Sequence, residues 1–72
     1  MPNTRKIHIA STFPVDLEIF PDGKVIVTDV EDVSHIITHK DGSPLSKMDV
    51  DFIVIERMSY WSISKKYRLT SV

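Results

Sequence analysis

The chain has 72 residues, a formal net charge of −1 at pH 7 and no cysteine. A chain of this length is expected to form one small domain, residues 1–72, that buries only about 60% of its unfolded surface. The absence of cysteine excludes disulfides and thiolate zinc sites, so stability must come from an apolar core or from a core shared between subunits. The small net charge argues against bulk attraction to nucleic acid or to anionic membranes.

The sequence indicates a protein without a membrane segment. Residues 1–6 are followed by no apolar stretch of the kind found in signal peptides. The longest uninterrupted apolar run extends from Phe52 to Ile55, which is far too short to cross a bilayer. We therefore expect a cytoplasmic protein with no membrane partner.

Three segments in the first part of the chain alternate between apolar and polar residues, as strands with one buried face do. These segments are residues 6–10, 15–19 and 24–28. Pro14 separates the first two, because proline cannot donate to a strand ladder. Pro21, Asp22 and Gly23 separate the second from the third, where proline presets φ and glycine accepts a positive φ. The second and third strands are therefore predicted to form a hairpin.

Residues 29–41 fit two structures. Apolar residues recur at helical spacing from Val30 to Ile37, and Asp29 could cap the start of such a helix. Residues 33–38 are also rich in β-branched side chains, which is typical of a strand. Both assignments stay open.

Two further strands are expected after a loop at residues 40–44. Residues 50–56 are apolar at both odd and even positions, which indicates a central strand covered on both faces. Residues 60–69 alternate between an apolar set and a set of serines and cations, which indicates a last strand, antiparallel to the central one, with one face in solvent. The predicted core contains Leu17, Ile19, Val25, Val27, Phe52, Val54, Ile55 and Trp61.

These elements predict a mainly β fold, or an α+β fold. We expect a small antiparallel sheet or barrel of about five or six short strands, with at most one short helix near residues 30–40. The edges of an open sheet carry unpaired backbone groups that a partner's strand or a second copy could pair with. A homodimer and a monomer are both compatible with the sequence.

The sequence gives little support for catalysis or for a cofactor. It has neither a Gly-rich phosphate loop nor a nucleophile motif. His35 and His39 have a spacing found in metal sites, but a zinc site normally needs three or four ligands, and no third ligand has a characteristic spacing. Asp49 and Asp51 would share a strand face, as paired catalytic carboxylates do, but no cleft that would desolvate one of them is evident. We expect no catalytic residue, no cofactor and no bound metal.

Charged residues are unevenly distributed along the chain. The first ten residues and the last fourteen carry cations and no acid, whereas the densest acidic cluster lies between them at residues 29–32. Strands from the two ends could lie side by side and form one basic face. The acidic cluster is either a solvated helix start or a surface that docks on a basic partner.

The segment from Tyr60 to Arg68 is the strongest candidate binding site, because it places aromatic residues among cations. Such residues dominate protein-interface hot spots, and they also suit single-stranded nucleic acid. The alternation assigns Trp61 and Tyr67 to the apolar face, which favours core aromatics beneath a basic surface strand. A protein interface comes next and nucleic acid last, because core aromatics cannot stack on bases. The predicted binding residues are Tyr60, Lys65, Lys66, Tyr67, Arg68, Arg5 and Lys6, with Asp29, Glu31 and Asp32 as a second, acidic surface.

The predicted function is a non-enzymatic binding module that acts by contact with another protein, as an adaptor or inhibitor of the kind that phages and mobile elements encode. The alternative is a small nucleic-acid-binding barrel that uses the basic C-terminal strand. Salt separates the two, because binding to nucleic acid through several cations weakens steeply with ionic strength.

Overall fold

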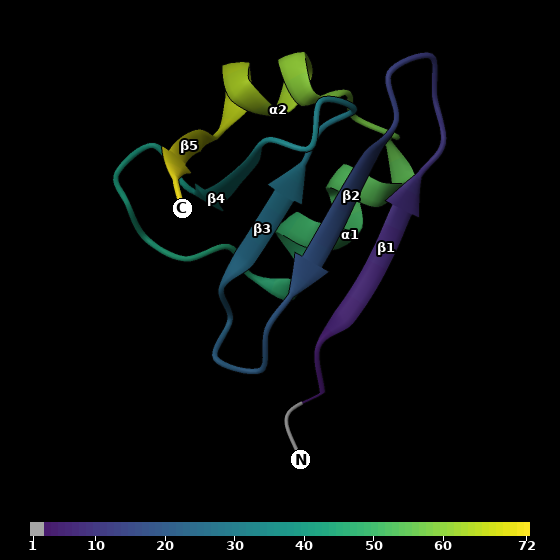
Figure 1. Ribbon diagram of the computed structural model, residues 1–72. Coiled ribbons are helices and arrows are strands. Elements are labelled where there is room, and N and C mark those ends of the chain that lie inside the picture. The colour runs from purple at the N-terminus through teal and green to yellow at the C-terminus, as the bar shows by residue number, and fades with distance from the viewer. Residues whose placement is uncertain (1–2) are drawn as a thin grey trace.

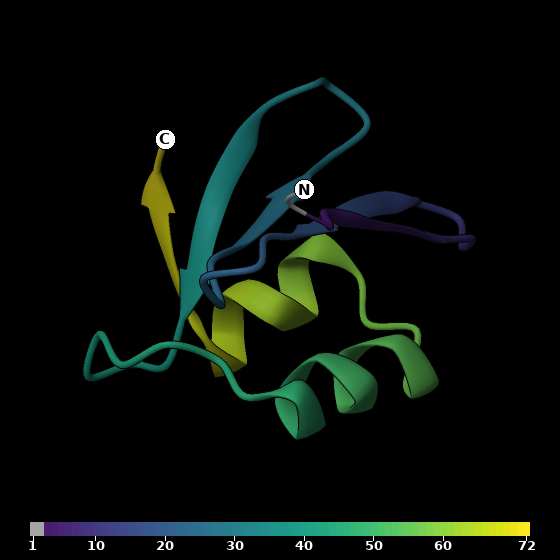
Figure 2. The ribbon, with the colours of Figure 1, turned by 90° about the horizontal axis from the view of Figure 1, so that it is seen from below.

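The computed structural model describes residues 3–72 as an antiparallel sheet with two helices on one face (Figures 1 and 2). Each strand pairs with the next along the chain, in the order β1-β2-β3-β4-β5, so β1 and β5 are the edges of an open sheet. The mainly β fold with five antiparallel strands confirms the sequence prediction. The elements are β1 (Arg5–Ile9), β2 (Val15–Ile19), β3 (Val25–Thr28), β4 (Ser34–Thr38), α1 (Lys47–Ile55), α2 (Tyr60–Lys66) and β5 (Arg68–Ser71).

The first three strands lie where the sequence predicts them, within one residue at each end. The turn between β2 and β3 has Gly23 at a φ of +95°, and the Phe20 N–H donates to the Lys24 carbonyl at 2.8 Å. The Asp22 carboxylate accepts from the Lys24 N–H at 2.9 Å. The predicted hairpin is therefore confirmed, for the predicted reason that glycine accepts a positive φ.

Residues 34–38 form strand β4, so the strand is the one of the two open assignments that the chain adopts here. Residues 3–72 form two helices, both later in the sequence, instead of at most one near residues 30–40. β4 pairs with β3 in a register that places Ile37 opposite Val25, and both side chains are buried. The β-branched composition of this segment therefore prevails over its partial helical spacing, because pairing with β3 buries one face of the strand.

The central strand predicted over residues 50–56 is also wrong, because this segment belongs to α1. Ser46 caps the helix: its side chain accepts from the Asp49 N–H, and the Asp49 carboxylate accepts from the Ser46 N–H. The apolar residues that would occupy both faces of a strand instead form two stripes on a helix. Val50 and Ile53 face the sheet and are buried, whereas the opposite stripe contains Met48, Phe52 and Ile55.

The strand predicted over residues 60–69 is a helix followed by a short strand. The Ser59 side chain accepts from the Ser62 N–H at 3.2 Å and begins α2. Tyr67 leaves the helix with an extended backbone, and β5 then pairs with β4 and not with a strand at 50–56. In the described part of the chain, neither helix is long or apolar enough to cross a membrane.

The core lies between the helices and the inner face of the sheet, and it includes three of the predicted residues, Leu17, Val25 and Val27. Ile19 and Val54 are partly buried against it. Phe52, Ile55 and Trp61 are 41%, 75% and 66% exposed, so their assignment to the core is wrong. The fully buried core positions on the two helices are Ile53 and Ile63.

The outer face of the sheet is not covered by either helix (Figure 2). Its rows of paired residues are mostly polar, with Lys6 opposite Glu18 and His8 opposite Asp16. Ile26 and Ile36 pair with each other near its centre. This face is therefore a polar surface built on strands whose opposite side chains form the core.

A hydrogen-bond network connects the start of α1 to the end of β4. Asp49 Oδ2 accepts from the Ser46 N–H, the Ser46 hydroxyl and His39 Nε2, at 2.8, 2.9 and 2.8 Å. The hydrogen bonds from Ser46 and from His39 hold the pKa of the Asp49 carboxyl below its ordinary value, although partial burial opposes this effect. The carboxylate form of Asp49 therefore contributes to the stability of the fold.

Replacement of Asp49 by alanine is expected to lower the free energy of unfolding by about 1–2 kcal/mol at pH 7, because the Ser46 N–H and the His39 side chain lose the carboxylate that accepts from them. The pKa of Asp49 is lower in the folded state, so this contribution is complete above the ordinary value of 3.8 and is lost as the pH falls through the folded pKa. Urea titrations from pH 7 to about pH 2.5 should show the gap from the wild type closing in acid. Asp51→Ala, which removes an exposed carboxylate of the same helix, is the control, and an equal loss there would contradict the assignment.

Candidate functional site

Three connecting segments meet at one end of the sheet (Figure 1). The β1–β2 and β3–β4 loops share this end because the strands form a meander, and α2 begins there. Together they enclose a hollow of 230 Å³, here called the apolar hollow. It is lined by Phe13, Pro14, Val15, Asp29, Val30, Ser59, Tyr60 and Trp61.

The apolar hollow is lined by large apolar side chains that are exposed to solvent, although such side chains are usually buried in the core. Phe13, Val30 and Trp61 are 65%, 59% and 66% exposed, and they come from the β1–β2 loop, the β3–β4 loop and the first turn of α2. Single exposed apolar residues are common, but a contiguous group with polar surroundings is typical of an interaction site. Connecting segments on a rigid sheet are also where binding residues usually lie.

The β3–β4 loop holds Val30 at its tip through its own hydrogen bonds. The Asp29 carboxylate accepts from the N–H groups of Glu31 and Val33, at 2.9 and 3.1 Å. The Asp32 N–H donates to the Asp29 carbonyl at 3.0 Å, and Asp32 adopts a φ of +63°, which aspartate tolerates better than most residues. The turn is therefore complete without a partner, and it presents Val30 to solvent.

Tyr60 forms an ordered wall of the apolar hollow. Its hydroxyl lies 2.7 Å from His35 Nδ1, and the two rings meet edge to face with centroids 5.7 Å apart. Burial raises the pKa of Tyr60, and the nearby Asp29 carboxylate raises it further. The phenol is therefore neutral at physiological pH and keeps its hydrogen bond to His35.

The two adjacent lysines of α2 lie over aromatic rings. Lys65 Nζ is 3.8 Å from the ring centroid of Trp61, and Lys66 Nζ is 4.1 Å from that of Phe52. Such contacts contribute about 0.5–1 kcal/mol at exposed sites. They restrict both aromatic side chains, and Lys65 covers part of one face of the Trp61 ring.

The other predicted basic residues do not join these lysines, so the expected basic face does not form. Arg5 and Lys6 lie on β1, at the edge of the sheet opposite to β5. Arg68 lies on β5, with its guanidinium close to Gly42 in the loop after β4. The two ends of the chain are therefore not side by side.

Tyr67 is buried in the core and does not contribute to an exposed binding surface. Its ring lies beside that of His39, with centroids 6.0 Å apart, and burial raises the pKa of its hydroxyl. The alternation assigns both Trp61 and Tyr67 to the apolar face, and only Tyr67 is buried, so its assignment as a binding residue and the assignment of Trp61 to the core are both wrong. The error for Trp61 follows from the helix, which turns this side chain outward where a strand would have turned it inward.

The histidine and aspartate pairs considered as chemical sites are separated in the structure. His35 bonds to Tyr60, whereas His39 bonds to Asp49. Asp49 and Asp51 lie two positions apart on a helix, where side chains do not face each other. Among residues 3–72, no three acidic or histidine side chains gather in a way that could hold a metal ion.

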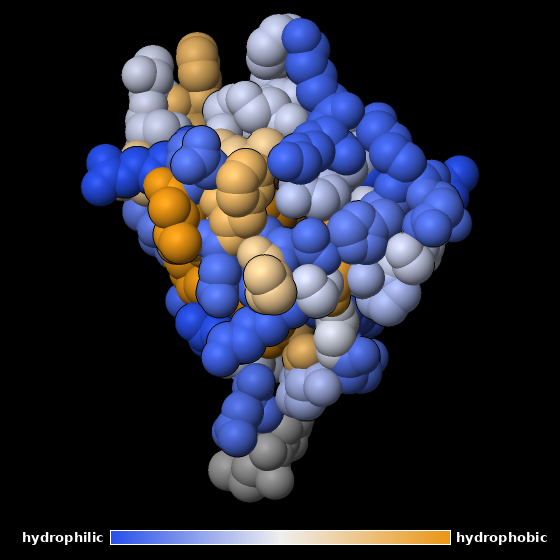
Figure 3. All heavy atoms as spheres, turned by 180° about the vertical axis from the view of Figure 1, so that it is seen from behind, coloured by the Kyte–Doolittle hydropathy of each residue, from blue (hydrophilic) through white to orange (hydrophobic). Residues whose placement is uncertain are grey.

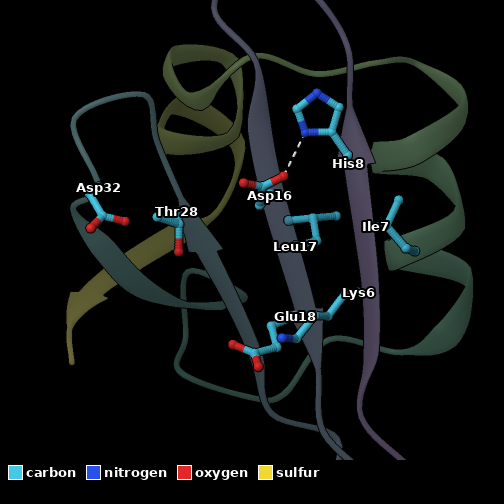
Figure 4. A pocket seen from close by; sticks show the side chains of 8 residues that line it. All are labelled: Lys6, Ile7, His8, Asp16, Leu17, Glu18, Thr28 and Asp32. Atoms are coloured by element: carbon cyan, nitrogen blue, oxygen red, sulfur yellow. Dashed lines mark hydrogen bonds and ion pairs between the residues drawn. The ribbon is translucent and has the colours of Figure 1, made fainter.

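A second hollow lies on the outer face of the sheet (Figure 4). It has a volume of 450 Å³ and is here called the open-face hollow. His8 Nδ1 lies 2.6 Å from Asp16 Oδ1 across its wall. Its lining is mainly polar: Lys6, Ile7, His8, Asp16, Leu17, Glu18, Thr28 and Asp32.

The outer stripe of α1 is a second exposed apolar surface. It consists of Met48, Phe52 and Ile55, and Figure 3 shows the helix-bearing face with apolar side chains gathered beside charged ones. All three residues come from a single helix. Phe52 also lines a hollow of about 430 Å³ between α1 and α2, whose other lining residues are mostly polar or charged.

Sequence reasoning missed Phe13 and Val30 and assigned Trp61 to the core. One available signal was Val30 itself, an apolar residue between acidic neighbours in a segment that could be a turn. Another was the capping sequence from Ser46 to Asp49 ahead of an apolar run, which indicates a helix start. If the segments predicted as strands over residues 50–56 and 60–69 are read as helices, Trp61 no longer shares a face with the buried Ile63 and can point to solvent.

Comparison with protein-family models, with curated proteins and with solved structures gives no match. The function is therefore argued from the geometry of the site alone.

Replacement of Asp29 by alanine is expected to loosen the β3–β4 loop, because Glu31 and Val33 lose their acceptor. Backbone order parameters of residues 30–32, measured by ¹⁵N relaxation, should fall from about 0.85 to below about 0.6. Asp29→Asn retains an acceptor oxygen and should keep the loop rigid. If Asp29→Ala leaves the loop equally rigid, the carboxylate does not hold Val30 in place.

Proposed function

We propose that this protein is a binding module without catalytic activity of its own, which acts by contact with another protein through the apolar hollow. The observation that carries the proposal is the convergence of Phe13, Val30 and Trp61, each more than half exposed, on one hollow. Aromatic residues such as Phe13 and Trp61 are enriched in protein interfaces, and Val30 adds apolar surface beside them.

The size of the apolar surface supports a useful affinity. Full burial of a large apolar side chain contributes about 1.5–3 kcal/mol, and a micromolar complex requires about 8 kcal/mol. Three such side chains supply a large part of that free energy, and the partner's own apolar residues add to it. Association also has an entropic cost, and this cost is smaller when the side chains of the site are already ordered in the free protein.

The walls of the apolar hollow are ordered by contacts within the chain. The Asp29 turn fixes Val30, the His35 hydrogen bond fixes Tyr60, and Lys65 restricts Trp61. Side chains that are already restrained lose less entropy when a partner binds. This arrangement favours the apolar hollow over the outer stripe of α1 as the docking site.

The three histidines of the chain each form a contact that contributes to the fold. Each has a partner side chain: His8 bonds to Asp16, His35 to Tyr60 and His39 to Asp49. All three pairs connect separate segments of the fold: β1 with β2, β4 with α2, and the residue after β4 with α1.

Binding of single-stranded nucleic acid is the second candidate function. It is favoured by the exposure of Trp61 and Phe52 beside Lys65 and Lys66, since exposed aromatics and cations together suit bases and phosphates. It is weakened because the lysines already lie over the rings on which bases would stack. Asp29 in the wall of the same hollow would also repel phosphates.

Affinity capture from a lysate of the cells that contain the protein, with and without nuclease, tests the proposal. We expect a stoichiometric protein partner that survives nuclease treatment. Trp61→Ala and Val30→Ser should each weaken its binding at least about tenfold. Ile55→Ser, which removes an equally exposed apolar residue from α1, should leave it unchanged.

Two results would contradict this function. If Ile55→Ser abolishes capture while Trp61→Ala does not, the docking surface lies on α1. If all partners are lost on nuclease treatment, the nucleic-acid alternative takes precedence.

A further inference from the structure

We infer that the apolar hollow receives a basic segment of the partner, in which an apolar anchor residue lies next to arginine or lysine. This inference rests on the proposed function and adds the chemistry of the partner. It follows from where the carboxylates lie relative to the apolar hollow.

The β3–β4 loop separates the two hollows and carries three acids around Val30. Asp29 lines the apolar hollow and Asp32 lines the open-face hollow, while Glu31 is exposed between them. A chain that places an apolar residue beside Val30 must therefore pass close to this acidic loop.

The open-face hollow extends the negative charge beyond the loop. Figure 4 shows Asp16, Glu18 and Asp32 around it, with Lys6 on the same wall as Glu18. The residues that line the two hollows include four carboxylates and one ammonium, a formal charge of −3 with His8 neutral.

Two basic groups oppose this pattern without reversing it. His8 Nδ1 lies 2.6 Å from Asp16 Oδ1, so one oxygen of that carboxylate already has a partner. Lys65 lies on the Trp61 ring but does not line the apolar hollow. The surroundings of Val30 therefore remain acidic and favour a cationic partner.

The charges and the apolar residues have different roles in this proposal. Exposed ion pairs contribute little affinity each, but they accelerate association and exclude like-charged partners. The apolar anchor residue of the partner supplies most of the affinity. The acidic loop favours anchors that have arginine or lysine beside them in the partner's sequence. We therefore expect the apolar hollow to bind basic segments more tightly than acidic ones, and we expect this difference to shrink as the salt concentration rises.

Three synthetic ten-residue peptides test the inference by ¹⁵N NMR titration of the whole protein. The first has a leucine flanked by arginines, the second a leucine flanked by glutamates, and the third has the arginines but a serine in place of leucine. We expect the first to shift the signals of Val30, Asp32 and the Trp61 indole. It should bind at least about tenfold more tightly than the second, and the difference should shrink between about 50 and 500 mM salt.

A variant with fewer carboxylates tests whether the β3–β4 loop causes the preference for the arginine peptide. Glu31→Gln with Asp32→Asn removes two carboxylates, and asparagine keeps the positive φ at residue 32. This double variant should reduce the preference for the arginine peptide about tenfold, whereas Asp51→Asn with Glu56→Gln on α1 should not change it.

The remaining outcomes overturn the inference in distinguishable ways. If both leucine peptides bind the apolar hollow equally, the partner need not be basic, and the proposed function stands. If the serine peptide shifts the same signals as strongly, charge alone acts and the anchor role of the hollow is lost as well. If no peptide shifts these signals up to about 2 mM, recognition of a basic segment is excluded. Signals of the hollow that shift with protein concentration alone would identify a second copy as the occupant.

Discussion

The inner face of the five-stranded sheet is apolar and must be covered, and this constraint determines the rest of the structure. Ile53 of α1 and Ile63 of α2 are fully buried against it and close the core. α1 is capped by Ser46, and Asp49 in its first turn bonds to His39, the residue after β4. The far end of α1 therefore brings the chain to the end of the sheet that carries the β1–β2 and β3–β4 loops. The start of α2 therefore lies beside those loops, and Trp61 completes the apolar hollow without being needed in the core.

Covering a sheet with two short helices leaves apolar surface exposed. α1 has apolar residues on both sides, so the burial of Val50 and Ile53 leaves Phe52 and Ile55 in partial or full contact with water. Large exposed apolar patches on small proteins usually mark interaction surfaces. Of the two patches here, only the apolar hollow combines walls from three segments with an acidic border, which is why we propose it as the docking site.

The sequence was sufficient to predict the mainly β class and the β2–β3 hairpin, because alternation and the turn at Gly23 are local signals. It was insufficient for residues 50–56, where apolar residues at both parities fit a buried strand and an all-round apolar helix equally well. The hydrogen bonds between Ser46 and Asp49 favour the helix, and the pattern of apolar residues contains no information about them. For the site, Tyr60 and Asp29 were predicted on separate surfaces, and only the tertiary fold brings them to one hollow.

The central claim is that Trp61, the single tryptophan of the chain, is exposed in the free protein and covered in the complex. Quenching of its fluorescence by acrylamide, before and after addition of the captured partner, tests this claim most directly. The account predicts accessibility close to that of the unfolded chain in the free protein and strong protection in the complex. A tryptophan that is inaccessible in the free protein, or equally accessible in both states, would contradict the account.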